Sequence, residues 1–176
     1  WGREFENWGV TSLLQDTTGR VWVGTRSGHV HMFDGIRLQG RESVPEMLQL
    51  SIDSLVEDAR GRVWFGSSLG KGFGYYDGES VRYFAPAEGA AYPAWVGAME
   101  IDEHGVVLIG SGSPRDWDGI CRFNGESFDR HGEATGAPVH AVMEDREGRL
   151  WIGTNEGVSC DDGEYVVTYT QEDGLP

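Results

Sequence analysis

Aromatic, basic and acidic side chains that could bind a polar molecule gather in a few short segments of the chain. The stretch "SPRDWDG" holds Arg115, Asp116 and Trp117 at consecutive positions, which combines a flat apolar ring with a cation and a carboxylate. Such a set suits a sugar or another polar ligand, because an aromatic face stacks on C–H groups while charged groups bind hydroxyls. The full set of candidate ligand-binding residues is Arg26, His29, Lys71, Tyr92, Trp95, Arg115, Asp116 and Trp117.

Catalytic and metal-binding patterns are weaker than this binding pattern. Carboxylates are abundant, but their spacing singles out no acid–base pair, and no Ser–His or Cys–His set stands out. His29 and His31 alternate on one expected strand without a third metal ligand nearby in sequence. Cys121 and Cys160 are expected to be free, buried and on opposite faces of their blades. We therefore expect no enzyme activity, no metal and no cofactor.

The bulk composition excludes several classes of partner. The chain has 176 residues, of which 14 are basic and 29 acidic, so the formal net charge is −15. A surface of this charge repels phosphate backbones and anionic lipids, so we expect no nucleic acid and no membrane contact by this segment. Seven Trp and 27 Gly indicate tight turns between short strands around an apolar core, rather than disorder.

A phrase built on Asp, Gly and Trp recurs along the chain at steps of 42, 44 and 43 residues. Asp stands three places before a turn glycine, and Trp stands three places after it, with one Leu exception. A β-branched residue precedes each Asp by six places, and a second glycine follows each Trp position by two. A period of about 43 residues predicts a β-propeller or a similar array. The repeat residues are Asp16, Gly19, Trp22, Asp58, Gly61, Trp64, Asp102, Gly105, Asp145, Gly148 and Trp151, with Leu108 at the exceptional position.

Each repeat divides into four short strands separated by turn residues. The second strand reads "RVWVGT", "RVWFGS", "VVLIGS" or "RLWIGT", with apolar or small residues on both faces. A strand without polar alternation is buried on both sides, as in a blade between two neighbouring blades. Trp would then fill the gap between blades, and the following Gly would let the next blade approach. The sequence predicts an all-β propeller of four four-stranded antiparallel blades, at about 10–50, 51–94, 95–137 and 138–176.

The segment "MEDREGRLWIGTNEGVSCDDGEYVVTYTQEDGLP" resembles the two-component regulator propeller repeat almost throughout. "LVEDARGRVWFGS" and "LLQDTTGRVWVGT" also match it well, whereas "EIDEHGVVLIGS" is degenerate. The resemblance implies the sensor domain of a bacterial membrane receptor, in the periplasm or outside the cell, and often one that detects carbohydrate fragments. The Asp box of sialidase-type propellers is a poorer match, because one residue separates its Asp and Gly where two intervene here.

The number of blades leaves two arrangements open. Residues 1–9 resemble the outer strand of a preceding blade, so the chain is expected to be a segment of a longer array. Four blades could close a ring alone, or two copies could form a homodimer that completes a larger ring. An open half-ring would leave apolar blade faces in water, which favours association.

The two rims of the expected propeller differ in their sequence variation. The Asp-x-x-Gly and Asp-Gly turns are nearly uniform, as a scaffold would be. The loops between second and third strands and the connections between blades vary, and they carry the candidate ligand-binding residues. These features favour a non-catalytic sensor propeller that binds a small polar ligand on the variable rim. The alternatives are a structural or protein–protein interaction propeller, and a propeller lyase or hydrolase.

Overall fold

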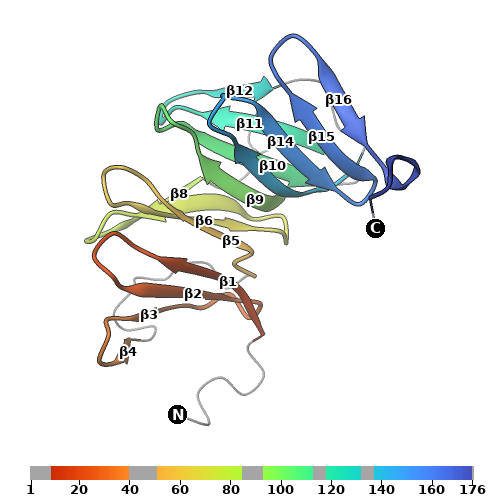
Figure 1. Cartoon of the computed structure of the whole chain (residues 1–176). Helices are drawn as coiled ribbons and strands as arrows, with labels where there is room; N and C mark the ends of the chain where they lie inside the picture. The colour runs from red at the N-terminus through yellow and green to blue at the C-terminus, as the bar shows by residue number, and fades with distance from the viewer. Residues whose placement is uncertain (1–8, 40–50, 85–92, 113–117, 132–136, 176) are drawn as a thin grey trace. The chain divides into compact units, whose positions relative to one another are not determined.

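The computed structural model describes residues 9–39, 51–84, 93–112, 118–131 and 137–175. Within these ranges, sixteen strands lie in four antiparallel sheets, and each sheet keeps its four strands in chain order (Figure 1). The expected all-β architecture of four-stranded propeller blades is confirmed. The chain forms two compact units, Trp1–Trp95 and Val96–Pro176. The expected outer strand at residues 1–9 falls almost wholly outside the described residues.

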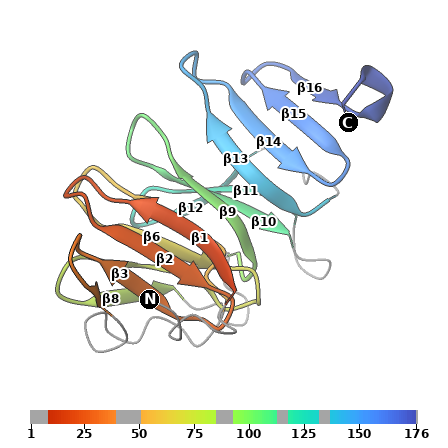
Figure 2. The same cartoon turned by 60° about the horizontal axis from the view of Figure 1, so that its bottom comes forward.

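The first unit holds two blades. Blade 1 consists of β1 (Val10–Gln15), β2 (Val21–Thr25), β3 (Val30–Phe33) and β4 (Leu38–Gln39). Blade 2 consists of β5 (Ser54–Glu57), β6 (Val63–Ser67), β7 (Gly72–Tyr76) and β8 (Val81–Phe84). Figure 2 brings forward the bottom of the view in Figure 1, where the strands of blade 1 are seen.

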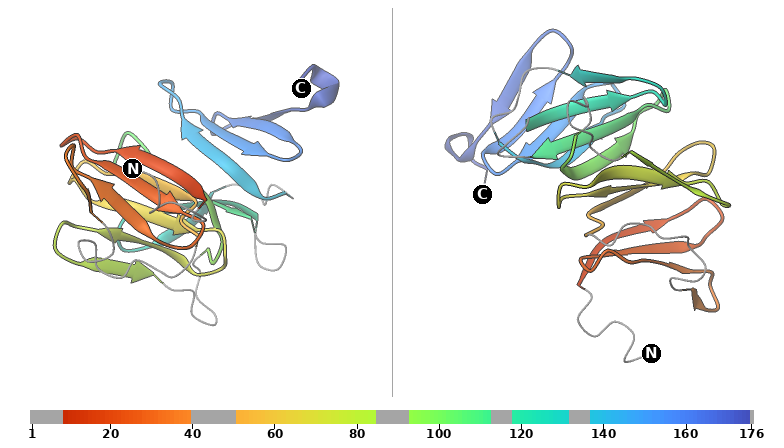
Figure 3. Two further views of the ribbon diagram at one scale, coloured as in Figure 1. Left: turned by 90° about the horizontal axis from the view of Figure 1, so that it is seen from below. Right: turned by 180° about the vertical axis from the view of Figure 1, so that it is seen from behind.

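The second unit repeats this plan. Blade 3 consists of β9 (Val96–Ile101), β10 (Val107–Gly112), β11 (Asp118–Phe123) and β12 (Phe128–His131). Blade 4 consists of β13 (Val139–Glu144), β14 (Leu150–Thr154), β15 (Gly157–Asp161) and β16 (Val166–Tyr169). A short 3₁₀ helix, Gln171–Asp173, follows β16 near the C-terminal end (Figure 3).

The core of the first unit is the seam between blades 1 and 2. Trp22 and Met32 pair across β2 and β3, so their side chains lie on one face of blade 1. They pack against Leu55 and Phe65, which pair across β5 and β6 in blade 2. Trp22 has no exposed surface, as expected for an indole that fills the gap between two blades.

The core of the second unit is the corresponding seam between blades 3 and 4. Leu108 and Ile120 of blade 3 pack with Val142, Leu150 and Ile152 of blade 4. Leu108 occupies the place of Trp22 and is equally buried. The same repeat position is therefore apolar and buried even in blade 3, where Leu108 replaces the indole.

Alternating turns divide the loops of each blade between two rims. In an antiparallel blade, the first and third turns lie at one edge and the second turn lies at the other. The Asp16 and Asp34 turns therefore share one rim, called here the turn rim. The β2–β3 and β6–β7 loops lie on the opposite one, called here the loop rim. Gly19 and Gly35 adopt φ of +86° and +94°, which explains why the turn rim repeats glycine.

Among the described residues, no helix has the length and apolar character needed to cross a membrane.

Candidate functional site

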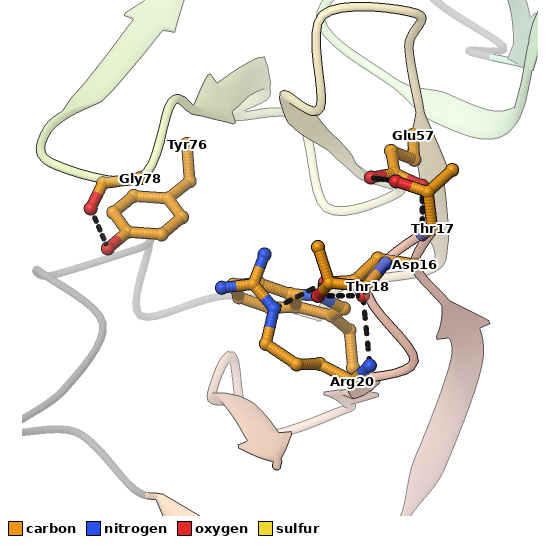
Figure 4. Close-up of polar contacts among 8 residues, drawn as sticks. Asp16, Thr17, Thr18, Arg20, Glu57, Tyr76 and Gly78 are labelled. Carbon is orange, nitrogen blue, oxygen red and sulfur yellow. Dashed lines mark hydrogen bonds and ion pairs between the residues drawn. The ribbon is translucent and has the colours of Figure 1, made fainter.

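The repeated Asp closes the turn between the first and second strands of its blade. Asp16 Oδ1 accepts hydrogen bonds from the backbone N–H groups of Thr18 and Arg20, at 3.0 and 2.9 Å. The Thr18 hydroxyl donates to the same oxygen at 2.7 Å (Figure 4). The Gly19 N–H donates to the Asp16 carbonyl at 2.9 Å. Asp16 thus caps its own turn, and Gly19 adopts the left-handed conformation that the turn requires.

The second oxygen of the same carboxylate reaches the seam between the blades. Asp16 Oδ2 accepts from Trp22 Nε1 at 2.8 Å and from Arg20 Nε at 2.6 Å. The Arg20 guanidinium also lies 5.5 Å from the centre of the Trp22 ring, which allows a cation–π contact. One buried carboxylate thus fixes a turn, an arginine and the indole that separates two blades.

This arrangement recurs with the sequence repeat. Trp64 Nε1 donates to Asp58 Oδ2 at 2.8 Å, and Trp151 Nε1 donates to Asp145 Oδ2 at 2.7 Å. The corresponding arginines, Arg62 and Arg149, donate to the same oxygens at 2.6 and 2.7 Å.

In the third repeat, both residues that donate to the second oxygen of the Asp carboxylate are replaced. Leu108 stands in place of Trp and Val106 in place of Arg, while Asp102 still caps its turn through the His104 and Val106 N–H groups. The contact between Asp, Arg and Trp was not predicted from the sequence. The joint loss of both donors in one repeat was the signal that could have revealed it.

Hydrogen bonding lowers the pKa values of these carboxyl groups. Burial of Asp16 opposes ionisation, but donors from Trp22, Thr18 and Arg20 outweigh it and hold the pKa of Asp16 well below its usual range. The pKa of Asp58 is lowered for the same reasons. The Trp151 hydrogen bond contributes most to lowering the pKa of Asp145 to about 2. All three carboxylates are therefore ionised at neutral pH and act as structural acceptors.

A second polar contact joins blades 1 and 2 at the turn rim. Glu57 stands just before the repeat Asp of blade 2, and its carboxylate accepts from the Thr17 backbone N–H at 2.7 Å and the Thr17 hydroxyl at 2.9 Å (Figure 4). In the second unit, Glu144 stands at the position of Glu57, and Glu103 at the position of Thr17. Among the described residues, the buried Glu144 Oε2 has no hydrogen-bond partner. The like charge of Glu103 explains why the contact is not repeated.

The loop rim of blade 1 carries two of the expected binding residues. Arg26 is exposed, and its backbone N–H donates to the Gly9 carbonyl at 2.8 Å. His29 lies just before β3 rather than on it, so the expectation that it alternates with His31 along one strand was wrong. Its Nδ1 lies 3.0 Å from the Ser27 hydroxyl, which in turn lies 3.1 Å from the Thr25 hydroxyl. These groups offer donors and acceptors to a polar ligand.

The loop rim of blade 2 contains both Trp95 and Lys71. A Cβ placed on Gly70 would lie 3.3 Å from Trp95 Nε1, so the half-buried indole rests against this turn. The Gly72 N–H donates to the Ala94 carbonyl at 2.8 Å and ties the connection after blade 2 to the same turn. Lys71, the residue that follows Gly70, is exposed. The turn that supports the indole therefore also contains an exposed lysine.

Asp53 and Ser68 also belong to this rim, and neither was predicted from the sequence as a site residue. Asp53 Oδ2 accepts from the Ser68 N–H at 2.9 Å and from the Ser68 hydroxyl at 2.7 Å. Ser51 donates to Asp53 Oδ1 at 2.9 Å. The Asp53–Ser68 contact spans 15 residues, so no local spacing indicates it.

Four of the expected binding residues lie outside the described residues: Tyr92, Arg115, Asp116 and Trp117. Cys121 and Cys160 are free and buried, and burial raises the pKa of the Cys121 thiol to about 11. Cys121 pairs with Ile109, and Cys160 pairs with Trp151. Their side chains thus lie on opposite faces of their blades, as expected.

The match to a known protein family falls on the repeated segments of the chain. The family model described as "two component regulator propeller" matches residues 6–27 and 134–156. Both matched segments contain the Asp turn of a blade and the second strand that follows it. The chain carries two-component regulator propeller repeats. A search of curated proteins finds no match.

Solved structures share the fold at low identity. The extracellular domain of a hybrid two component system from B. thetaiotaomicron aligns with a TM-score of 0.76 and 21% identity, over 95% of this chain and 24% of that one. Virginiamycin B lyase from Staphylococcus aureus aligns with a TM-score of 0.73 and 12% identity, over 92% and 55%. The extracellular domain of a one component system from B. thetaiotaomicron gives 0.50 and 18%, over 96% and 30%. The chain thus spans about a quarter of the length of the first structure and about half of the lyase.

Proposed function

We propose that this chain is the non-catalytic sensor propeller of a two-component-type receptor and that it binds a small polar ligand, such as a carbohydrate, on the loop rim. The observation that carries the proposal is that the Trp95 indole lies against Gly70, in the same turn as the exposed Lys71. The family repeat and the fold shared with extracellular domains of signalling systems support a sensing role. They also support a place for this segment in the periplasm or outside the cell.

The chemistry of the loop rim favours a polar ligand with an apolar face. The Trp95 ring can stack on the C–H face of a sugar ring. Lys71 and Arg26 are exposed and can donate to hydroxyl or carboxylate oxygens. Because the chain carries a net charge of −15, these cations make the rim locally more favourable for an anionic group than the rest of the surface.

The turn rim offers a different kind of surface. Its carboxylates are occupied by the backbone, arginine and indole donors of their own blades. Side chains that hold the scaffold cannot change partner for a ligand without loosening a blade. Ligand recognition is therefore assigned to the loop rim. The signal is transmitted by a shift in the geometry of the blades, because the ligand binds one arrangement of the blades more tightly than another.

A binding screen with matched variants tests this proposal. Neutral sugars, sugar acids and short oligosaccharides are screened by thermal shift, and hits are measured by isothermal titration calorimetry. Trp95→Ala is expected to weaken binding at least about tenfold, or ~1.4 kcal/mol. Lys71→Ala is expected to weaken sugar acids more than neutral sugars. Arg60→Ala removes an exposed cation from the turn rim and serves as the control, with unchanged affinity.

Two results would count against the proposal. Equal affinity in the Trp95→Ala, Lys71→Ala and wild-type chains would place the ligand elsewhere. Turnover of any panel member by the wild-type chain would favour a propeller lyase or hydrolase instead.

A further inference from the structure

The turn between the third and fourth strands of each blade is organised by its first residue. In blade 2, Asp77 Oδ1 accepts hydrogen bonds from the backbone N–H groups of Glu79 and Ser80, at 3.0 and 2.7 Å. Asp34 and Asp162 accept the corresponding pairs of bonds in blades 1 and 4. A glycine follows each of these aspartates in the sequence. One carboxylate oxygen therefore caps this turn in three blades.

Blade 3 keeps the same turn but builds it on an amide. Asn124 Oδ1 accepts from the backbone N–H groups of Glu126 and Ser127, both at 2.9 Å. Asn124 Nδ2 donates to the Ser127 hydroxyl at 3.1 Å. Gly125 follows with a φ of +101°, the value that Gly78 has in blade 2. Blade 3 thus carries Asn–Gly where the other three blades carry Asp–Gly.

An Asn–Gly pair can rearrange with water as the only added reagent. The backbone nitrogen of Gly125 attacks the side-chain carbonyl carbon of Asn124 and forms a new C–N bond. The bond from that carbon to Nδ2 breaks, and Nδ2 leaves as ammonia with the proton of the Gly125 N–H. Water then opens the five-membered imide at either carbonyl, which gives aspartate or isoaspartate. Nothing is oxidised or reduced, and glycine favours the first step because no side chain shields its nitrogen.

The turn of blade 3 leaves both reacting groups accessible. Asn124 and Gly125 are exposed, and apart from its chain neighbours no atom lies within 4 Å of a Cβ placed on Gly125. The hydrogen bonds of the Asn124 side chain are also exposed. Water competes for exposed hydrogen bonds of this kind, and such turns open without global unfolding. The amide can therefore leave its capping position and turn toward the Gly125 nitrogen.

The equivalent aspartates are protected by their charge. The turn N–H groups, chiefly those of Ser80 and Tyr165, lower the pKa values of Asp77 and Asp162. Both side chains are thus ionised at neutral pH. An ionised carboxylate resists attack, because its negative charge repels the electron pair of the nucleophile. The amide in blade 3 has no such charge.

We propose that Asn124 is a deamidation site of the folded chain, converted through the Gly125 nitrogen to aspartate and isoaspartate. The aspartate product gives blade 3 the carboxylate that caps this turn in the other blades, so the β11–β12 hairpin keeps its form. Isoaspartate instead adds one carbon to the main chain within the turn. The hairpin pairs up to Phe123 and Phe128, whose ring centres lie 4.3 Å apart, so this product loosens that pairing.

Incubation of the full chain in mildly alkaline buffer, followed by peptide mass spectrometry, tests the proposal. The peptide with Asn124 is expected to gain one dalton at least about tenfold faster than the peptide with Asn155. Asn155 is the internal control, because it is an exposed loop asparagine followed by Glu156. Ion-exchange chromatography of the intact chain should show a species with one more negative charge than the original −15.

Two outcomes of this experiment overturn the proposal. Equal rates at Asn124 and Asn155 in the folded chain would mean that the turn does not favour the reaction. A parallel incubation in urea gives the rate of the unfolded chain, and reaction at Asn124 in urea alone would mean that the folded turn protects the amide.

Two variants separate the turn from its particular blade. Asn124→Asp is expected to abolish the reaction at this position and to leave the urea midpoint of the chain unchanged. Asp77→Asn creates Asn–Gly in the matched turn of blade 2 and is expected to add a second reactive peptide. An unreactive Asp77→Asn chain would overturn the argument that this turn exposes its amide. Circular dichroism of each variant checks that it is folded.

Discussion

Replacing Trp22 by Phe isolates the hydrogen bond that joins the repeat Asp to the blade seam. Phe keeps most of the buried ring but lacks the N–H that donates to Asp16 Oδ2 at 2.8 Å. A hydrogen bond to a charged group contributes about 1.5–3 kcal/mol. The smaller ring adds a loss of about 1 kcal/mol by leaving space beside Tyr76, whose ring centre lies 5.8 Å away. The free energy of unfolding of the first unit should therefore fall by about 2.5–4 kcal/mol.

Urea unfolding followed by far-UV circular dichroism measures this loss. The matched variant is Trp151→Phe, which removes the same type of bond at a half-buried indole and should destabilise the chain less. A double-mutant cycle with Asp16→Asn then measures the coupling between the two side chains. Additivity of the two changes within about 0.5 kcal/mol would refute the reasoning, because it would mean that the carboxylate and the indole do not depend on each other.

Three further outcomes are expected from other features of the chain. The folded-state pKa of Asp145 is about 2, below its ordinary value of 3.8. The ionised Asp145 side chain therefore stabilises the folded chain fully above about pH 5, and this contribution is lost as the pH falls toward 2. Acid unfolding measures the loss. Glu103→Thr should stabilise the second unit by about 0.5–1.5 kcal/mol in urea unfolding, by giving Glu144 the partner found in the first unit, and no change would contradict this. Cys121 should react with a thiol reagent only after denaturation, because its thiol is buried with a pKa of about 11, and fast labelling of the native chain would contradict this.

The repeat made most of the fold predictable from the sequence. The fixed offsets among Asp16, Gly19 and Trp22 recur in later repeats, so a local pattern repeated four times indicated the strands, their turns and the buried indole. The second glycine of each repeat was also predictable as the place where the next blade approaches. The structure shows the reason: Ser12 of the same blade and Ile52 of the next blade occupy the space that a side chain on Gly24 would need.

Contacts between distant segments were not predictable in the same way. Asp53 and Ser68 meet because they flank the paired strands β5 and β6, in which Ser54 lies opposite Gly66, and the sequence did not give this register. The Glu57–Thr17 contact spans 40 residues and depends on two blades lying face to face. His29 was placed on a strand because it alternates with His31, but the hydrogen bonds of Thr25 with the His29 backbone hold it in the loop instead.

Hydrogen exchange at the indole N–H groups, followed by NMR, tests most directly whether the repeat Asp fixes the indole of its blade. In blades 1 and 2, the carboxylates of Asp16 and Asp58 accept the N–H of a buried indole. Trp22 and Trp64 should therefore give indole protons that exchange slowly, and Asp16→Ala should abolish the protection of Trp22 while Trp64 keeps its own. Rapid exchange of all seven indole protons in the native chain would contradict this role of the repeat Asp.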